Sequence, residues 1–413
     1  MTEIRKLTLE EISSFIDIVT NAYTGIMENT KDSKERLINY YKDTQENNNT
    51  VQLYGAFRNG KLIGGMRLHS FEMNYENKKV KVGGVGLVAV DLLHKKEKVA
   101  KDLITYFIKT NEEANIPILA LYPFRPDFYL KMGFGYGTKM NQYHILPDAL
   151  ASEGKKEHIR FVGNEESEQL FNCFNTFASR QHGMMYKQSF EMNRLLNDPG
   201  KRVIAFYKDQ VLDSYMSFTF KKMSDTNFCL NNLVIDEMIY NSPEGLLALQ
   251  SFLQSQGDQV NRIVLNTQDE SFYHVLQDPR NHTNEMIPSV YHESHTSGVG
   301  IMYRMNDVSQ LLEGKYVEAQ ACNVKISVID MFMKETQELY LSVKEGQLFM
   351  SKHEEGEIQV TLDMASFSSL LMGSVDFSAL YRYGKVQISA PLHVEVLSSI
   401  FKMDSKPICM TLF

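Results

Sequence analysis

The sequence predicts a protein of the α/β and α+β classes, with two consecutive mixed α/β domains followed by a smaller α+β domain. A chain of 413 residues is too long for one ordinary core and should divide into domains of about 100–200 residues. An order of hairpin, strand, helix and strand occurs twice, with a spacing of roughly 150 residues. From about Ser297, short alternating strands and apolar helices replace that order. We therefore expect domains at 1–150, 151–296 and 297–413.

The first unit begins with a helix and continues into a sheet. Thr8 precedes acidic residues, and apolar residues then recur at the helical positions 12, 15, 16, 19 and 23. Asn59–Gly60 separates apolar runs at 53–57 and 62–66, which is a strong signal for a β-hairpin. Apolar runs at 82–90 and 116–122 predict two further strands with a helix between them. A sheet of this kind holds its ligand at the carboxyl ends of the central strands.

The second unit repeats this order in degenerate form. Residues 203–212 mirror the hairpin, with Asp209–Gln210 at the turn, and residues 233–236 mirror the strand at 87–90. A helical run at 246–253, a strand at 262–266 and Tyr273 complete the copy. The loop at 241–245 contains an acid and no cation, so it should repel a pyrophosphate. We interpret this unit as a structural copy that helps to wall the ligand site.

The third unit has a different pattern. Residues 299–305 read as a strand, and 307–312 read as a short capped helix. Alternating apolar residues predict half-buried antiparallel strands at 339–343, 346–350 and 358–362. Residues 363–373 resemble a capped helix that ends at glycine. The unit is therefore a sheet covered by apolar helices.

Composition excludes several classes of protein. The net charge of −8 argues against non-specific nucleic-acid binding. No apolar run approaches the ~20 residues that span a bilayer, and the N-terminal residues lack the apolar core of a signal peptide. The cysteines form no CxxC pair, which favours reduced cysteines in a cytoplasmic protein over a disulfide framework or a metal site. They are Cys173, Cys229, Cys322 and Cys409.

A basic cluster follows the strand at 82–90 and opens the next helix. It contains Lys95, Lys96, Lys98 and Lys101. Free backbone N–H groups and the helix dipole attract anions at such a position, and lysines add mobile positive charge. A solvated first turn is the alternative, and His94 beside the cluster reads as a solvated neighbour and not as a base.

The strand, the loop and the segment Phe128–Gly135 together resemble the acetyl-CoA-binding half of the GNAT superfamily of N-acetyltransferases. In that family the strand is followed by an Arg/Gln-x-x-Gly-x-Gly/Ala loop that holds the pyrophosphate. Lys95 occupies the first place and Ala100 the last, and Lys98 stands where the middle glycine belongs. Lys98 could therefore block the cradle, or its side chain could turn outward and bind phosphate. The resemblance implies acetyl-CoA as acyl donor. The residues that it implies for binding are Val88, Val90, Lys95, Lys96, Lys98, Val99, Ala100 and Lys101.

The whole chain resembles the "enhanced intracellular survival" N-acetyltransferases of bacteria, which have two acetyltransferase domains and a sterol-carrier-like domain. The family's terminal carboxylate acts as general base and a tyrosine protonates the departing thiolate, and the matching residues here are Phe413 and Tyr129. Family members acetylate amines, including aminoglycosides, and assemble as hexamers. The resemblance therefore implies a homo-oligomer that transfers acetyl directly to an aminoglycoside-like, polyamine or lysine amine.

Each candidate residue also has a simple structural interpretation. Tyr129 could be a core tyrosine, and Phe413 could end a buried edge strand. Tyr23 and Phe71 could line an amine pocket or only pack in the core. The rival function is a binding protein in which Lys98 prevents acetyl-CoA binding and another site holds an apolar ligand.

Overall fold

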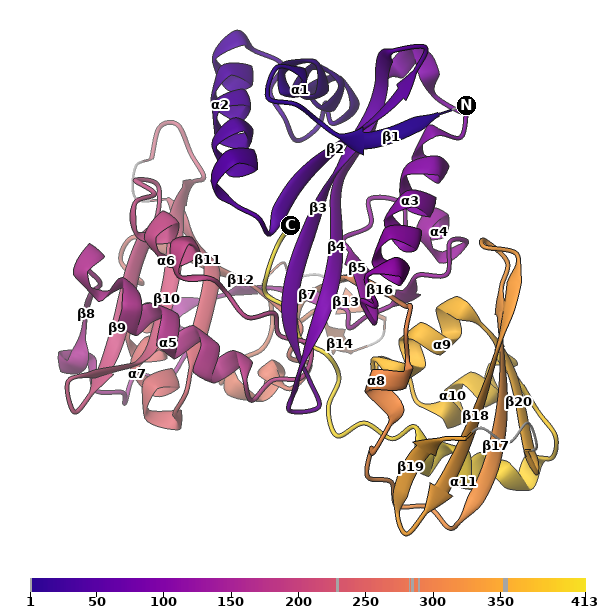
Figure 1. The fold of residues 1–413 in the computed structure, drawn as a ribbon. Helices are drawn as coiled ribbons and strands as arrows, with labels where there is room; N and C mark the ends of the chain where they lie inside the picture. Colours follow the sequence, from indigo (N-terminus) through magenta and orange to yellow (C-terminus); the bar gives the residue numbers. More distant parts are fainter. Residues whose placement is uncertain (1, 228–229, 282, 284–285, 289, 352–355) are drawn as a thin grey trace.

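Three large sheets organise the chain, in the computed structural model shown in Figure 1. The structure describes residues 2–227, 230–281, 283, 286–288, 290–351 and 356–413. Their strands form two seven-stranded sheets, a five-stranded sheet and a small two-stranded hairpin. Cys229, one of the cysteines expected to be reduced, lies outside these residues, and Cys173, Cys322 and Cys409 are free thiols. Within the described residues, no helix is long and apolar enough to cross a membrane.

The first sheet carries the predicted ligand-binding strands. Its order is β1 (Glu3–Lys6), β2 (Val51–Arg58), β3 (Lys61–Tyr75), β4 (Lys78–Val90), β5 (Ile118–Leu121), β16 (Met302–Met305) and β6 (Gly135–Tyr136). Its helices are α1 (Glu11–Ala22), α2 (Lys31–Asn47), α3 (Val99–Glu113) and α4 (Pro126–Leu130), with a short 3-10 turn η1 (Leu92–His94) after β4. Buried apolar residues of α3 pack on one face, and those of α1 pack with β2 in a second cluster. The predicted helix, hairpin and strands are therefore confirmed.

The second sheet has the same plan. Its order is β8 (Ile159–Phe161), β9 (Arg202–Lys208), β10 (Val211–Lys222), β11 (Asn231–Tyr240), β12 (Val260–Thr267), β7 (Met140–Ile145) and β15 (Thr296–Gly298). Its helices are α5 (Ser167–Ala178), α6 (Ser189–Leu196) and α7 (Pro243–Gln254), and β13 (Met286–Ile287) pairs with β14 (Tyr291–His292) beside it. Both hairpin turns have positive φ at two successive residues, Asn59–Gly60 and Asp209–Gln210. That geometry matches the twist of antiparallel strands, so the duplicated hairpin predicted from the sequence is confirmed.

Two strands cross the domain ranges expected from the sequence. β7 lies within residues 1–150 but pairs with β12 of the second sheet, and β16 lies beyond residue 297 but pairs with β5 of the first. Each sheet is thus completed at the same position by a strand from outside its own segment. The expectation that residues 299–305 begin the third domain was wrong, because apolar alternation shows that a strand is buried without showing which sheet it joins.

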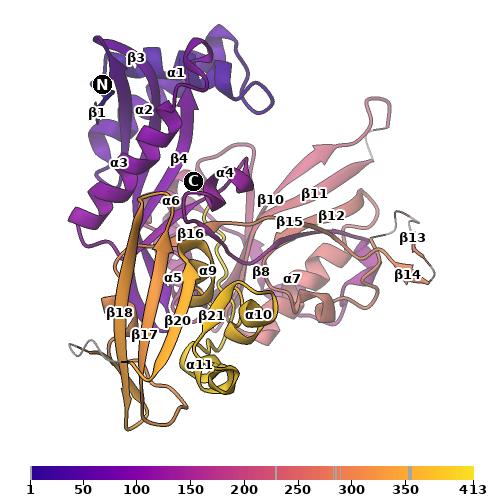
Figure 2. The same cartoon turned by 90° about the vertical axis from the view of Figure 1, so that its right-hand side faces the viewer.

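The third sheet is covered by helices on one face. Its order is β19 (Gln347–Met350), β18 (Glu335–Lys344), β17 (Cys322–Asp330), β20 (Ile358–Asp363) and β21 (Val386–Ile388). The short α8 (Ser309–Leu312) leads into it, and its helices are α9 (Met364–Leu371), α10 (Phe377–Arg382) and α11 (Val394–Ile400). Figure 2 shows these three helices on the same side of β17, β18 and β20. Asp363 caps α9 and Gly373 follows it at a φ of 69°, as the sequence predicts.

Polar contacts lock the third domain to the first. Arg304 of β16 forms a buried ion pair with Asp330 of β17, and its Nη1 donates to the Met132 carbonyl at 3.1 Å. The Tyr75 hydroxyl, at the end of β3, donates to the Leu371 carbonyl at 2.7 Å. Since a broken buried ion pair leaves an uncompensated charge, these contacts fix where the two domains meet.

His182 joins all three domains and should make the protein sensitive to acid. Its Nε2 donates to the Met372 carbonyl at 3.1 Å, and its Nδ1 accepts from the Glu76 backbone N–H at 3.3 Å. Burial lowers the pKa of His182 to about 4. The unfolded chain therefore takes up the proton first as pH falls from about 6.5 to about 4, and stability should drop by roughly 3 kcal/mol over that window.

Thermal unfolding between pH 7.5 and pH 4.5 tests this prediction. The His182→Gln variant should be less stable at neutral pH but should lose less stability on acidification than the wild type. The exposed His158→Gln variant is the matched control and should follow the wild type. Identical pH slopes for the wild type and His182→Gln would contradict the assignment.

Candidate active site

β4 and β5 separate at the carboxyl end of the first sheet. Their parallel ladder covers Val82–Gly84 against Ile118–Ala120, and β4 then continues to Val90 unpaired with β5. Leu87 has a φ of 52°, at a bulge where the pairing with β3 shifts register. The backbone from Gly86 to Val90, which contains the predicted cofactor-binding residues Val88 and Val90, therefore borders an opening in the sheet.

The basic loop lies directly after this strand. Lys95, Lys96, Lys98 and Lys101 are exposed, Ala100 is half-buried, and Val99 is buried in the core beneath them. Glu97 anchors the loop, because it forms an ion pair with Arg58 and contacts His94 Nδ1 at 3.2 Å. The lysine side chains therefore point into solvent at the start of α3.

Lys98 holds the backbone conformation for which a glycine is usually used. Its φ is 66°, and that of Lys96 is 67°. A left-handed conformation costs about 1–2 kcal/mol for a residue with a Cβ. Lys98 is the N-cap of α3 and makes no side-chain cap hydrogen bond. The backbone of the loop at Lys98 therefore has the left-handed conformation that favours glycine, while the Lys98 side chain is exposed.

The C-terminus of the chain lies at the same opening. A Cβ on Gly86 would approach the carboxyl carbon of Phe413 to 3.0 Å and one of its oxygens to 3.2 Å. Gly84 likewise makes room for the Phe413 ring, at 3.0 Å. Figure 1 and Figure 2 show the last segment leaving the third domain and ending beside the central strands of the first sheet. The glycines of β4 therefore allow the terminal carboxylate to approach the strand closely.

An aromatic cluster holds the terminal residue. The Phe413 ring lies 5.0 Å from Phe71, 5.4 Å from His69 and 5.3 Å from Tyr122, measured between ring centroids. The Tyr122 hydroxyl donates to the Thr411 carbonyl at 3.2 Å. Phe71 therefore packs against the terminal residue and against the core, and its part in an amine pocket stays a prediction.

The sequence analysis missed His69, Arg67 and Tyr122. Burial, and then the charge of Arg67, lower the pKa of His69 well below 6.5, so its ring is neutral at physiological pH. Its Nε2 is buried and has no hydrogen-bond partner among the described residues. A period of two along β3 places His69 and Arg67 on the same face as Phe71. That alternation could have identified them.

Tyr129 and Tyr23 form a second group at the opening. Tyr129 is 3% exposed, and its ring packs against Phe128 and Phe134 at centroid distances of 5.2 and 6.1 Å. The ring of Phe124 touches both tyrosines. The Tyr23 hydroxyl donates to the Val88 carbonyl at 3.1 Å. Tyr23 therefore contacts the strand that was expected to hold the cofactor.

Both phenols stay protonated at neutral pH. Burial raises the pKa of Tyr23 to about 12. Burial, and then the neighbouring Tyr23, raise the pKa of Tyr129 well above 10. Each phenol is therefore a hydrogen-bond donor at neutral pH, and burial would raise the proton affinity of a thiolate formed beside it as well.

Tyr129 and Phe413 pack on opposite faces of the first sheet. Tyr129 belongs to the core cluster of Leu119 and Leu121, whereas Phe413 packs on the cluster of Ile118 and Ala120. Successive side chains of a strand point to opposite faces, so the β5 alternation separates these two clusters. A molecule lying in the opening would have a phenol on one side and a carboxylate on the other.

The second domain lacks the corresponding groups. Ser242 caps α7, and its first turn carries Glu244 and no lysine. Tyr273, which completed the copy in the sequence, is 43% exposed. A cavity of about 790 Å³ lies in this domain, away from the basic loop. Glu244 is paired with Lys208 at 3.5 Å. That this unit does not bind a pyrophosphate stays a prediction.

Comparison with known proteins identifies the domains. Models of the acetyltransferase (GNAT) domain match residues 3–137 and 183–302, and the model of the sterol carrier protein domain matches residues 308–410. No curated protein matches the chain.

Several solved structures share the whole architecture. A GCN5-related N-acetyltransferase from Anabaena variabilis is 18% identical with a TM-score of 0.81, and Eis1 from Mycobacterium abscessus is 19% identical with a TM-score of 0.74. A probable N-acyltransferase from Enterococcus faecalis is 15% identical with a TM-score of 0.78. In each case the alignment covers 100% of both chains. These structures support the fold, and the matched domains carry the assignment: the chain is an enzyme of the GNAT acetyltransferase superfamily, with two such domains, a C-terminal sterol carrier protein domain and acetyl-CoA as its acyl donor.

Proposed function

We propose that the first domain transfers acetyl directly from acetyl-CoA to a primary amine, and that Phe413 and Tyr129 are its catalytic residues. One observation carries the proposal: the terminal carboxylate contacts β4 at Gly86, where the strand parts from β5, opposite the face that holds Tyr129. The lysines at the start of α3 would hold the pyrophosphate, and the β4 backbone at Val88 and Val90 would hold the pantetheine arm.

The reaction requires two proton movements. The amine nitrogen attacks the thioester carbonyl carbon, and the carbon–sulfur bond breaks. The proton that the amine loses goes to the Phe413 carboxylate, directly or through water, and the Tyr129 hydroxyl gives a proton to the departing thiolate. The products are the N-acetyl amine and coenzyme A. His69 is a second neutral group on the Phe413 side that could accept the amine proton.

The acceptor would enter on the Phe413 face. An aromatic wall of Phe71, His69 and Tyr122 surrounds the carboxylate there, and such a wall suits a cationic amine. The choice among an aminoglycoside-like, polyamine or lysine acceptor stays a prediction, as do the hexameric assembly and the cytoplasmic location.

A panel of amines tests the proposed reaction. Release of the coenzyme A thiol should be measured with acetyl-CoA and an aminoglycoside, a polyamine or a lysine peptide, and the acetylated product should be identified by mass. At least one amine should give saturable transfer, and its quaternary analogue should give none because it has no N–H. Thiol release that is independent of every amine would contradict amine transfer.

Replacing Tyr129 should slow the chemical step without preventing binding. The Tyr129→Phe variant should lower kcat by about 10²-fold, because the thiolate would leave without a proton donor. Its affinity for acetyl-CoA should stay near that of the wild type. Steady-state kinetics and calorimetry measure the two effects. The half-exposed Tyr136→Phe variant is the matched control, and equal kcat values for both variants would exclude Tyr129 as the acid.

A further inference from the structure

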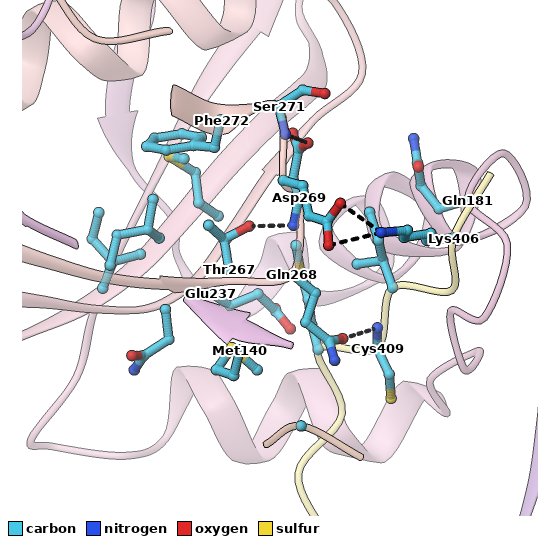
Figure 3. A pocket seen from close by; sticks show the side chains of 18 of the residues that line it. Met140, Gln181, Glu237, Thr267, Gln268, Asp269, Ser271, Phe272, Lys406 and Cys409 are labelled. Carbon is cyan, nitrogen blue, oxygen red and sulfur yellow. Dashed lines mark hydrogen bonds and ion pairs between the residues drawn. The ribbon is translucent and has the colours of Figure 1, made fainter. Parts of the chain in front are cut away.

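The cavity of about 790 Å³ lies at the corresponding opening of the second domain, as Figure 3 shows from close by. The parallel ladder between β11 and β12 ends at Ile235 and Leu265, and the residues that follow on each strand line the cavity. Residues of the C-terminal tail, from Asp404 to Leu412, form a further wall. The duplicated fold has therefore kept an opening between its central strands where the cofactor-binding loop is missing.

The tail is fixed in place as the wall of this cavity. The backbone N–H of Cys409 donates to Gln268 Oε1 at 2.6 Å, and that of Ile408 donates to the His182 carbonyl at 2.8 Å. Lys406 Nζ lies 2.8 Å from a carboxylate oxygen of Glu270. The Gln268–Cys409 contact is visible in Figure 3. Hydrogen bonds and an ion pair within the protein therefore fix the position of this wall.

The charge of the lining excludes a phosphorylated ligand. The lining includes the acids Asp236, Glu237, Asp269, Glu270 and Asp404, and Lys406 is its one lysine. Lys406 is paired with Glu270, and Asp236 is paired with Lys201 at 3.6 Å, which leaves Asp269 and Asp404 without an ion-pair partner among the described residues. Glu237 is buried and already bound by Lys187 and the Tyr215 hydroxyl. A pyrophosphate would meet repulsion here, whereas a cation would be attracted.

Asp269 provides the carboxylate most directly available to a ligand. It accepts a hydrogen bond from the Ser271 backbone N–H at 2.8 Å, and it forms no ion pair among the described residues. Burial, and then the charge of Asp269, raise the pKa of the Tyr240 phenol in the cavity wall to about 12. The negative charge of Asp269 therefore acts on an aromatic residue of the cavity wall.

The rest of the wall is apolar and partly aromatic. Phe177 and Tyr240 pack edge to face with their ring centroids 5.7 Å apart, and Phe272, Met238 and Met410 also line the cavity. Aromatic faces and carboxylates both attract the positive charge of an organic cation. The apolar wall favours burial of the carbon skeleton of such a ligand. The volume is in the range of about 300–1,000 Å³ that small-molecule sites occupy.

We propose that the second acetyltransferase domain binds an organic cation with an apolar body in this cavity, and that binding requires no acetyl-CoA. The cavity lies against the second sheet and reaches Tyr122, directly after β5, whose ring also packs against Phe413. Tyr129 and the lysines of the basic loop are not among its lining residues. The tail that forms its wall ends at Phe413, so the site adjoins the segment that carries the terminal carboxylate.

Calorimetry with benzyltrimethylammonium tests the proposal. This quaternary ion has a charge and a ring but no N–H, so it cannot be acetylated. The full chain should bind it saturably without acetyl-CoA, more tightly at low salt. Benzoate, an anion of similar size, should not bind.

Two variants locate the site. Asp269→Asn keeps the acceptor for the Ser271 N–H and should weaken binding about three- to tenfold, because it removes one charge. Val299, a half-exposed residue at the lining, can be changed to Trp to fill the cavity, and this variant should not bind. The exposed Asp258→Asn variant is the matched control and should bind like the wild type.

Three results would each overturn the proposal. Benzoate could bind as tightly as benzyltrimethylammonium, or the cation could show no saturable binding up to about 10 mM. Asp269→Asn could also bind the cation with the same affinity as the wild type. The measurement is independent of the proposed reaction. A variant whose transfer activity is lost at Phe413 should still bind the cation, so failure of the catalytic assignment and failure of this site give different results.

Discussion

Converting the C-terminal carboxylate of Phe413 to an amide is expected to reduce acetyl transfer by about 10²-fold or more. The amide keeps the Phe413 ring against Phe71, His69 and Tyr122 but cannot accept a proton. The Tm should stay close to that of the wild type, because the packing contacts are unchanged. The amidated chain can be prepared by ligation of a synthetic C-terminal peptide and compared with the ligated acid in the same assay.

The complementary variant separates the carboxylate from the ring. Phe413→Ala keeps a terminal carboxylate beside Gly86 but removes the ring that packs on Gly84. It should raise KM and lower Tm, and it should reduce kcat less than the amide does. Full turnover in the amidated enzyme, or equal loss of kcat and Tm in both forms, would show that the terminus only packs.

Replacing Lys98 by glycine is expected to weaken acetyl-CoA binding while stabilising the fold. The Lys98 side chain is exposed at the N-terminus of α3, so its loss removes a positive charge from the pyrophosphate site. The affinity should fall about tenfold, and its dependence on salt should become weaker. Relief of the left-handed backbone strain should exceed the entropic cost of glycine, with a net gain of up to roughly 1 kcal/mol.

The control for this prediction relieves backbone strain of the same kind at a residue far from the basic loop. Gln210, exposed in the second hairpin, has a φ of 67°, so Gln210→Gly should gain similar stability without changing acetyl-CoA binding. Calorimetry at two salt concentrations and thermal unfolding give both quantities. Tighter binding in Lys98→Gly would mean that the lysine obstructs the cradle, and the rival interpretation of an impaired binding protein would then be favoured.

Local patterns were sufficient for most elements of the fold. The Asn59–Gly60 turn, the apolar run of β4 and the Asp363 cap of α9 each depend on residues close in sequence, so the corresponding hairpin, strand and helix follow directly. By contrast, α2 was not predicted. Only Tyr41 and Gln45 of its residues are buried, so it has little apolar periodicity to detect.

The sequence by itself determined the duplicated order, the basic loop after β4 and the absence of such a loop in the second domain, because these features depend on neighbouring residues. Only the tertiary structure decided that β7 completes the second sheet, that β16 completes the first, and that Phe413 lies beside Gly86, more than three hundred positions away. It also decided that His69 is buried and neutral. Strand pairing and burial depend on contacts between distant segments, and alternating apolar residues show that a strand is buried without identifying its partner.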